Sequence, residues 1–378
     1  MTKQAEHEAF RKAVRSFIER DLAPRYDEFV ANRGFSREIW RIAGEQGLLG
    51  LQVPEGLGGS GAPDWSYQAI LGEELARFSL AANSCFAIHV DVVAPYLVEL
   101  AQADQQRRWL PGFCSGDLVS AIGMTEPSGG TDLADLRTSA RPTSDGWVLN
   151  GSKTFITNGA SADLAVVAAR TDPDARSKGI SLFVVEKDMP GFTVGRKLDK
   201  IGQPESDTAE LFFDDVPVPV THLLGEENRG FAYMMERLPQ ERISAAVANL
   251  AHAASVFEET VTYAKERRAF GRSIGSFQSM KFRLAELATT IDVTQAYVDR
   301  CVALHAEHRL SAVDAAKAKW WTAEVQSNVL DGCVQVFGGY GYMAEYRVAR
   351  AWRDARVTRI WAGTNEIMKE LVGRSLGL

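Results

Sequence analysis

One segment of the chain combines glycines with hydroxyl side chains in a way that suits an anionic ligand. It is the stretch Met124–Asp132, with the sequence MTEPSGGTD. Gly129 and Gly130 allow positive φ and a close approach of the backbone. Thr125 and Thr131 add hydroxyl groups, and a loop of this kind presents backbone N–H groups to an anion. An ordinary tight turn uses the same residue types, and from this stretch alone the turn is the simpler interpretation.

A second segment, Lys153–Asn158, places a ring and a hydroxyl on one face of a predicted strand. Phe155 and Thr157 are two residues apart, so their side chains point to the same side and could meet one flat ligand. The strand is expected to end at Asn158-Gly159, a dipeptide typical of hairpin turns. The alternative is an ordinary strand end with a half-buried aromatic residue.

Glu241 is the third feature, because it lies two residues after Pro239 in a helix with apolar neighbours. Arg237 stands four residues earlier, and a surface pair between the two would contribute about 0.2–0.5 kcal/mol. From spacing alone, that surface pair is the preferred interpretation of Glu241.

The fourth feature is a run of arginines near the C-terminus. Arg347, Arg350, Arg353, Arg356 and Arg359 recur at every third position, with Asp354 among them. This interval spirals slowly around a helix, so the arginines need not face one partner. Ion pairs with the acid-rich remainder are favoured over a nucleic-acid stripe.

Several familiar site motifs are missing from the sequence. No GxGxxG follows a predicted strand, and neither GxxxxGK[ST] nor GxSxG occurs. His305 and His308 are the only histidine pair with ligand-like spacing, and they lack the HExxH arrangement. We therefore expect no Rossmann site, no phosphate loop, no hydrolase elbow and no metal.

Composition indicates an ordinary soluble protein. The 378 residues are 46% hydrophobic and 24% charged, with a net charge of −7. A pI near 5.6 argues against nucleic-acid binding. The four cysteines form no CxxC pair, which is typical of reduced thiols in a cytoplasmic protein. The stretch 243–257 is shorter than the roughly 20 apolar residues that span a bilayer, and the N-terminus has no secretory signal, so we expect no membrane insertion.

Three regions of different texture must position these features. Residues 1–114 show helical periodicity, residues 115–225 alternate short β-branched runs with turns, and residues 226–378 are helical again. The pattern predicts an α+β fold with an N-terminal α-helical domain, a middle antiparallel β-barrel or sandwich, and a C-terminal four-helix bundle. Pro239 is expected to kink the long helix or to start a new one. The candidate strands are Leu118–Met124, Trp147–Asn150, Leu164–Ala169, Ile180–Val185, Phe192–Val194 and Glu210–Phe213.

Taken together, several spaced segments resemble the acyl-CoA dehydrogenases over essentially the whole chain. The segments are Met124–Asp132, Lys153–Asn158, Arg267–Gly271 (RRAFG), Gln335–Gly341 (QVFGGYG) and Ala362–Glu366 (AGTNE). The stretch Gly225–Ile243 is most similar to the long-chain branch and its bacterial relatives, with the isovaleryl branch close in pattern. Several motifs in the same order are far more specific than any one of them.

The resemblance implies an FAD enzyme that desaturates an acyl-CoA between its α and β carbons. A carboxylate would take the α proton while the flavin N5 accepts the β hydride. An electron-transferring flavoprotein or a similar acceptor and a homodimer or homotetramer are implied as well. Six of the cofactor residues would hold the adenine end of FAD across a subunit interface, namely Arg267, Phe270, Gln278, Gln335, Gly338 and Gly339. The implied cofactor-binding residues are Met124, Thr125, Gly130, Thr131, Phe155, Ile156, Thr157, Arg267, Phe270, Gln278, Gln335, Gly338, Gly339, Thr364 and Glu366. The implied substrate-binding residues are Thr131, Ser177, Arg242, Ala362 and Gly363.

One departure from the family pattern concerns the catalytic base. Most members resembling this chain carry a Glu immediately before the Gly-Thr of the C-terminal motif, where this chain has Ala362. The long-chain and isovaleryl branches carry the Glu on the long helix instead, and the matching residue here is Glu241. The resemblance thus reverses the interpretation of Glu241 from a surface acid to the base. Arg242 points about 100° around the helix and is assigned to substrate or loop positioning.

Three alternatives stay open. The chain could be a dehydrogenase of an acyl-carrier-protein thioester in a biosynthetic pathway. It could also be an acyl-CoA oxidase or a flavin monooxygenase, since one fold supports several chemistries. A non-catalytic flavin-binding protein is the remaining interpretation. The length and branching of the acyl group are not predicted.

Overall fold

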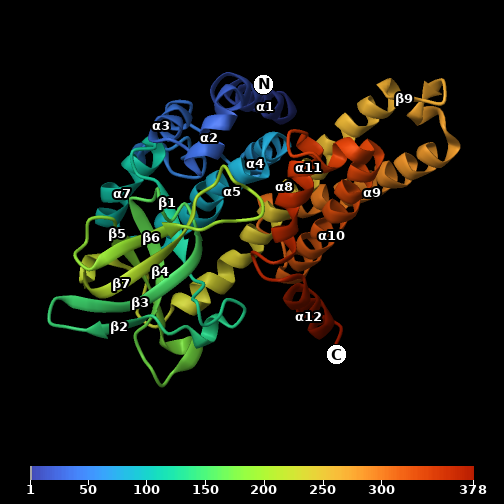
Figure 1. The fold of residues 1–378 in the computed structure, drawn as a ribbon. Coiled ribbons are helices and arrows are strands. Elements are labelled where there is room, and N and C mark those ends of the chain that lie inside the picture. The colour runs from blue at the N-terminus through green and yellow to red at the C-terminus, as the bar shows by residue number, and fades with distance from the viewer. Residues whose placement is uncertain (1) are drawn as a thin grey trace.

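The computed structural model describes residues 2–378, which form helices, then a sheet, then helices (Figure 1). The N-terminal helices pack on one side of the sheet, and the C-terminal helices extend away from it toward a hairpin at the far tip. This arrangement confirms the predicted order of a helical, a β and a second helical region. The N-terminal helices are α1 (Lys3–Phe17), α2 (Tyr26–Asn32), α3 (Arg37–Glu45), α4 (Ser66–Phe78), α5 (Leu80–Ala87), α6 (Ala94–Glu99) and α7 (Ala103–Ser115).

Helices α5 and α6 are joined by a π-helical turn, Ile88–Val93, into one helical stretch. This stretch, Leu80–Glu99, is long and apolar enough to cross a membrane, but 78% of its most apolar window is buried inside the fold. It therefore has the character of a core helix. The comparison with the length of a bilayer span was made above for residues 243–257 and not for this longer stretch.

The middle region is one eight-stranded sheet of mixed direction. Its strands follow the order β6-β7-β3-β2-β4-β5-β8, and β1 pairs with β4. Most pairs are antiparallel as predicted, but β1 and β2 each run parallel to β4. The strands are β1 (Ser120–Gly123), β2 (Ser139–Pro142), β3 (Gly146–Thr157), β4 (Leu164–Arg170), β5 (Ile180–Glu186), β6 (Phe192–Lys197), β7 (Thr208–Pro219) and β8 (Leu223–Leu224).

The turn at Asn158-Gly159 differs from the prediction. Strand β3 does end at Thr157, and Asn158 has a left-handed backbone with φ 61°. However, β4 pairs with β1, β2 and β5 rather than with β3, so the dipeptide does not close a hairpin. The prediction was wrong because the Asn158 side chain is used elsewhere. Its amide donates to the carbonyls of Cys85 at 2.9 Å and of Ser120 at 3.2 Å.

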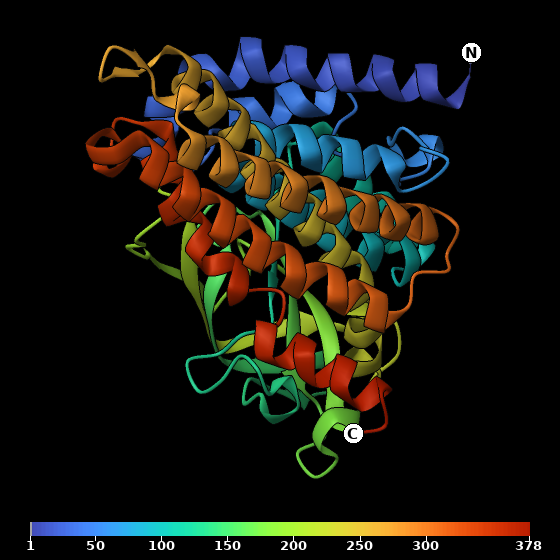
Figure 2. The same ribbon diagram turned by 90° about the vertical axis from the view of Figure 1, so that its right-hand side faces the viewer.

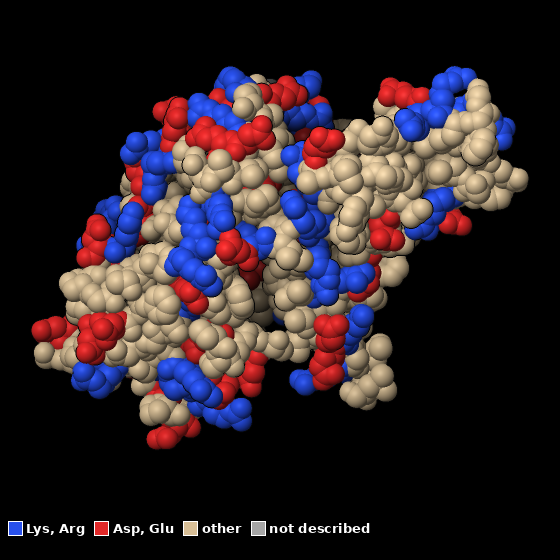
Figure 3. All heavy atoms as spheres, viewed as in Figure 1, with Lys and Arg blue, Asp and Glu red and all other residues tan. Residues whose placement is uncertain are grey.

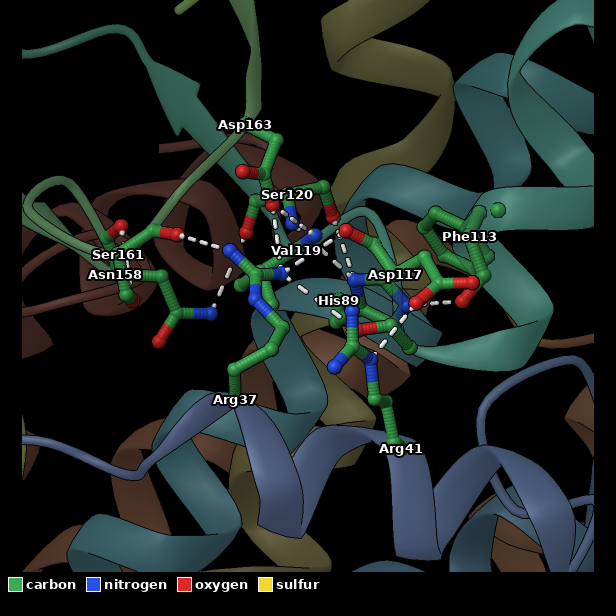
Figure 4. Close-up of polar contacts among 12 residues, drawn as sticks. Arg37, Arg41, His89, Phe113, Asp117, Val119, Ser120, Asn158, Ser161 and Asp163 are labelled. Carbon is green, nitrogen blue, oxygen red and sulfur yellow. Dashed lines mark hydrogen bonds and ion pairs between the residues drawn. The ribbon is translucent and has the colours of Figure 1, made fainter.

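Buried polar contacts fasten the N-terminal helices to the start of the sheet (Figure 4). His89 stacks on Phe113, its Nε2 donates to the Phe113 carbonyl at 3.1 Å, and its Nδ1 accepts from Ser120. Burial lowers the pKa of His89 to about 3, so the ring is neutral and serves as a structural link. Arg37 donates to the Ser161 carbonyl and pairs with Asp163 at 2.6 Å.

The C-terminal region is built on three long helices that pack into a bundle (Figure 2). Helix α8 runs unbroken through Pro239, so the proline neither ends it nor starts a new one. A small hairpin of β9 (Arg268–Ala269) and β10 (Arg272–Ser273) caps the far end of α8. The helices are α8 (Gly230–Glu266), α9 (Gln278–Ala306), α10 (Ala312–Phe337), α11 (Arg347–Asp354) and α12 (Asn365–Ser375).

Candidate active site

A cavity of about 910 Å³ lies where the sheet meets the first turns of α8 and the segment between α11 and α12. Figure 3 shows a hollow near the middle of the molecule, with Lys and Arg atoms on both sides of it. The volume suits an organic ligand of cofactor size. Its lining includes nine of the predicted site residues, which are Thr125, Gly130, Thr131, Phe155, Thr157, Arg242, Ala362, Gly363 and Thr364.

The loop Met124–Asp132 is held in shape by a buried ion pair beneath it. Lys153 Nζ contacts Glu126 Oε1 at 2.8 Å and also donates to the Met124 carbonyl at 3.2 Å. Glu126 further accepts from the backbone N–H groups of Arg137 at 2.6 Å and Thr138 at 2.8 Å. Burial opposes ionisation of Glu126, but the Lys153 charge and these hydrogen bonds lower its pKa to about 2. Burial lowers the pKa of Lys153.

Gly130 packs closely against Thr125 in this loop. A Cβ at this position would stand 3.0 Å from Thr125 Cγ2. Gly129 has open space around it, so its backbone faces the cavity without steric hindrance. The backbone N–H groups of Glu126 and Gly129 are bonded to each other's carbonyls, both at 3.0 Å, so they are not free for an anion. The loop is a tight turn that lines the cavity, with the hydroxyl residues Thr125 and Thr131 among the lining.

Strand β3 delivers Phe155 and Thr157 to the cavity through a bulge. Between Lys153 and Ile156, β3 has one residue more than β7, and Phe155 takes a φ of 60°. Such a bulge re-aims a side chain. The Phe155 ring is 67% exposed, which is unusual for a ring inside a protein cavity and leaves its face free for a ligand. Ile156 points the other way, into the sheet core, so only its backbone can contact a ligand.

The segment between α11 and α12 has a strained backbone that a buried lysine holds. Ala362 has φ 52° and Gly363 has φ 87°, both in the left-handed region. Such a conformation costs an alanine energy and marks a functional constraint. Lys319 of α10 is fully buried and donates from Nζ to the Gly363 carbonyl at 2.6 Å. Burial, and then the charge of Arg242, lowers the pKa of Lys319 to about 8.

Glu241 is an enclosed acid with no bonding partner at one oxygen. Oε1 is buried and makes no hydrogen bond within residues 2–378. Burial raises the pKa of the carboxyl to about 7, against a smaller opposing effect of Arg242. Its neighbours Leu238 and Arg242 line the cavity, so this turn of α8 forms the wall. The Glu241 side chain is half-buried, and its buried, unpartnered Oε1 is costly unless a ligand or a proton completes it.

Two further buried polar atoms near Glu241 also lack partners in the described chain. They are the Tyr96 hydroxyl, from α6, and Arg242 Nε. Tyr96 is close enough to Glu241 for the carboxylate charge to add to the effect of burial, which raises the pKa of the phenol. Three unpartnered polar groups around one point favour a bound polar ligand over a closed core.

Four predicted site residues lie beside the cavity without lining it. The Met124 carbonyl is engaged by Lys153, and Ile156 belongs to the core. Ser177 lies in the turn Arg176–Gly179, and the Glu366 side chain is exposed in the first turn of α12. Any role of these four residues in this cavity would have to be indirect or through the backbone.

Six predicted cofactor residues gather at the opposite end of the bundle. Residue 267 follows Glu241 by a helical rise of about 40 Å, and the hairpin lies at the far tip (Figure 1). Arg267 lies over the Tyr340 ring at 5.4 Å, which brings this end of α8 next to the end of α10. Phe270 is 95% exposed. The residues at this tip are Arg267, Phe270, Gln278, Gln335, Gly338 and Gly339.

Two groups of functional residues were missed by the sequence analysis. The first is the Glu126–Lys153 pair, 27 positions apart, and the second is Lys319. Arg353 and Arg356 also line the cavity and give it positive charge. The arginine run is regularly spaced, but its spacing does not indicate which of its members face the cavity.

The cavity residues fit FAD. The lining includes an exposed aromatic ring, hydroxyl side chains and three arginines, Arg242, Arg353 and Arg356, which suits a flat ring joined to a pyrophosphate. A helical–sheet–helical chain with such a cavity, and with an acid next to its wall at Glu241, has the construction of a flavin-dependent dehydrogenase.

Comparison with known proteins supports this class of enzyme. The family models for the acyl-CoA dehydrogenase N-terminal, middle and C-terminal domains match residues 4–117, 121–216 and 228–377. The mitochondrial long-chain specific acyl-CoA dehydrogenase of Sus scrofa is 48% identical over 376 residues, which is 98% of this chain and 86% of that protein. The mitochondrial isovaleryl-CoA dehydrogenase of Pongo abelii is 36% identical over 98% of this chain and 88% of its own length.

A crystal structure of acyl-CoA dehydrogenase from Geobacillus kaustophilus has a TM-score of 0.97 and 44% identity, and covers 100% of this chain and 99% of its own. The chain belongs to the acyl-CoA dehydrogenase family. Its cofactor is FAD, and its reaction class is the FAD-dependent dehydrogenation of an acyl-CoA. The predicted family, fold, cofactor and reaction class are thereby confirmed.

Proposed function

We propose that this chain dehydrogenates a straight medium- to long-chain acyl-CoA and that Glu241 is the base that removes the α proton. The observation that carries the role of Glu241 is its carboxyl, whose Oε1 is buried without a partner beside the cavity wall and whose pKa burial raises to about 7. The substrate class is supported by the likeness to the long-chain specific enzyme of Sus scrofa. A base with a pKa near the working pH transfers protons most effectively.

The position that usually carries the base in this family cannot do so here. Ala362 has no side-chain acceptor, and the adjacent Gly363 has none either. Four acids line the cavity, and each has a partner: Glu126 pairs with Lys153, Asp132 accepts from the backbone N–H of Ala134, Asp199 pairs with Arg33 and Asp354 accepts from the backbone N–H of Gln203. Glu241, next to the lining residue Arg242, differs from them because its buried Oε1 has no partner within residues 2–378.

Removal of an α proton from a thioester requires that its carbonyl be polarised as negative charge develops. We assign the backbone N–H of Ala362 to this carbonyl, because the Lys319 contact to Gly363 holds the strained turn in place. Lys319 and Arg242 are close enough for their charges to interact, and both positive charges favour the negative charge that develops on the thioester carbonyl. FAD held by the cavity residues would supply the acceptor of the β hydride, so that removal of the α proton at Glu241 would leave a trans double bond between the two carbons.

The cofactor contacts divide between two copies of the chain in this proposal. Thr125, Thr131, Phe155 and Thr157 would face the flavin, and Arg353 and Arg356 the pyrophosphate. The exposed residues at the hairpin tip lie too far from their own cavity to contribute to it. They would hold the adenine end of a cofactor bound by a partner subunit, which makes a homodimer, or a homotetramer formed from two dimers, the functional assembly.

The electron acceptor and the location belong to the same proposal. We expect an electron-transferring flavoprotein to reoxidise the bound cofactor, as the family resemblance implies. All four cysteines are free and buried, which supports a reducing compartment such as the cytoplasm.

A panel of acyl thioesters with an artificial electron acceptor tests the substrate class. The expected result is a maximum of kcat/KM for straight medium or long acyl-CoA substrates, with weaker activity on isovaleryl-CoA. Preference for an acyl-carrier-protein thioester, or rapid reoxidation of the substrate-reduced flavin by air alone, would assign the chain to one of the alternative activities.

A further inference from the structure

Asp91 is a buried acid that none of the chemistry above uses. It lies in the π-helical turn between α5 and α6 and is 2% exposed. No Lys, Arg or His pairs with it among residues 2–378. Its Oδ2 accepts from Ser244 Oγ at 2.7 Å and its Oδ1 from Trp65 Nε1 at 3.1 Å. An acid without a counter-charge at such depth is costly, so a specific role is expected.

The contacts of Asp91 bracket the proposed base on α8. Ser244 lies three residues after Glu241, on the same side of the helix. Gln240 immediately precedes Glu241, and its Nε2 donates to the Asp91 backbone carbonyl at 2.8 Å. One residue of the N-terminal helices therefore holds α8 on both sides of Glu241.

This turn of α8 needs an external brace because of Pro239. Proline has no N–H, so the carbonyl four residues earlier, at Met235, loses its regular helical hydrogen bond. The helix is unbroken there, but its backbone is less rigid from Met235 to the proposed base, Glu241. Side-chain contacts to a neighbouring helix replace that rigidity.

Two further contacts, made by His305 with Gln240 and with Trp65, stiffen the hydrogen-bond network around Asp91. The Gln240 Oε1 atom contacts His305 Nε2 at 3.2 Å, and the Trp65 and His305 rings pack edge to face at 4.9 Å. Trp65 therefore contacts both ends of the network, Asp91 directly and Gln240 through His305. A π-helical turn is rare and is frequently associated with function, and here it carries the acid at the centre of the network.

We propose that Asp91 is a positioning residue that fixes the turn of α8 carrying Glu241, and so holds the base at the α carbon of the substrate. The proposal rests on the proposed function of Glu241. Asp91 does not line the cavity, so its loss should affect the proton-removal step and not binding.

The test compares Asp91→Ala and Asp91→Asn in the FAD-loaded enzyme, with Glu74→Ala as the matched control. Glu74 is a second buried acid of the N-terminal helices, but its partners are Arg11 and Arg15 on α1. Asn at position 91 can still accept from Trp65 and can donate to Ser244 Oγ, so Asp91→Asn keeps the brace and removes the charge.

Misplacing a reacting group by about 1 Å costs about 100-fold in rate, so Asp91→Ala should lower kcat by about that factor. KM and FAD content should change little, and the isotope effect of α-deuterated substrate should rise because proton removal becomes slower. Asp91→Asn should stay within about fivefold of wild type, the loss of about one hydrogen bond, and Glu74→Ala should keep its kcat.

Three outcomes would overturn the proposal. They are an unchanged kcat in Asp91→Ala, an Asp91→Asn variant as slow as Asp91→Ala, or a slow Glu74→Ala variant. If Asp91→Ala does not fold, Ser244→Ala should lower kcat by about fivefold through loss of one contact, and an unchanged kcat would overturn the proposal. Activity of Glu241→Gln is a separate readout, because it would refute the role of Glu241 while the outcomes above would leave that role intact.

Discussion

Replacing Lys153 with Met should destabilise the protein strongly, because it isolates a buried carboxylate. Within residues 2–378, Lys153 is the one cation in contact with Glu126, and both side chains are nearly inaccessible. Removing one partner of such a pair costs about 3–5 kcal/mol. Met keeps most of the length of the lysine stem, so the loss comes from the charge rather than from a cavity. We expect the free energy of unfolding to fall by about 3–5 kcal/mol.

The sign of the pH dependence should reverse as well. In the wild-type protein Glu126 has a folded pKa below its usual 4.5. Its stabilising effect is therefore present above pH 4.5 and is lost as the pH falls toward 2. Without Lys153, burial raises the folded pKa of Glu126 above 4.5, so the folded state is favoured at low pH and loses stability as the pH rises.

Urea unfolding of the FAD-loaded protein at several pH values, from about 5 to about 7, measures both effects. The difference between variant and wild type should widen as the pH rises. The double variant Glu126→Gln/Lys153→Met removes both charges but keeps an acceptor for Thr138, and should recover more than half of the loss. An unchanged unfolding midpoint for Lys153→Met, or a double variant at least as unstable as the single one, would refute this account of the loop.

Three further predictions concern the site and the tip. The kcat/KM of dehydrogenation should rise with pH and reach half its maximum near pH 7, because Glu241 must be ionised to accept a proton. A flat profile from about pH 5.5 to about pH 8.5 would contradict this. Lys319→Met should lower the free energy of unfolding by about 1–3 kcal/mol, since the buried Gly363 carbonyl loses its donor, and it should also lower kcat. Unchanged urea unfolding and steady-state kinetics would show that the Lys319 contact with Gly363 does not hold this segment in place. Phe270→Ala should change the stability of the fold by less than about 0.5 kcal/mol but weaken FAD retention, as measured by the FAD-to-protein ratio after dialysis. Unaltered FAD retention would argue against the role of the tip.

Local pattern was sufficient where one strand or loop provides the whole feature. The alternation at Phe155 and Thr157 predicted that both side chains would share a face, and both line the cavity. The residue types of Met124–Asp132 predicted a tight turn, and the loop forms one. The bulge at Phe155 was not predictable, because it depends on how β3 pairs with β7, more than 50 residues further along the chain.

The supporting residues could not be predicted, because their roles depend on tertiary contacts. Lys319 has charged and apolar neighbours in sequence like any lysine on a long helix, and only its contact with Gly363 reveals its function. Lys153 and Glu126 lie in different segments and meet only when β3 lies beneath the loop. Asn158 illustrates the opposite case, where a strong local hairpin signal is overridden by side-chain bonds to two distant carbonyls.

The family resemblance assigns roles to single residues, but only the fold shows which of these residues lie close together. The resemblance implies that the six residues at the tip hold the adenine end of the cofactor across a subunit interface, and α8 separates them from Thr125 and Phe155 by much of its length. Sequence order carries no information about which copy of a chain completes a site. The fold shows only that the two groups lie at opposite ends of the long helix α8 within one chain.

The most direct test of the central claim is anaerobic single-turnover reduction of the bound FAD by a long-chain acyl-CoA, compared between wild type and Glu241→Gln. Gln has nearly the size of Glu but cannot accept the α proton, so the variant should bind FAD and acyl-CoA normally. If Glu241 is the base, the flavin absorbance of the variant should show almost no reduction, while that of the wild type bleaches fully. Reduction of the variant at a rate comparable to wild type would show that another group removes the proton, and would contradict the role assigned to Glu241.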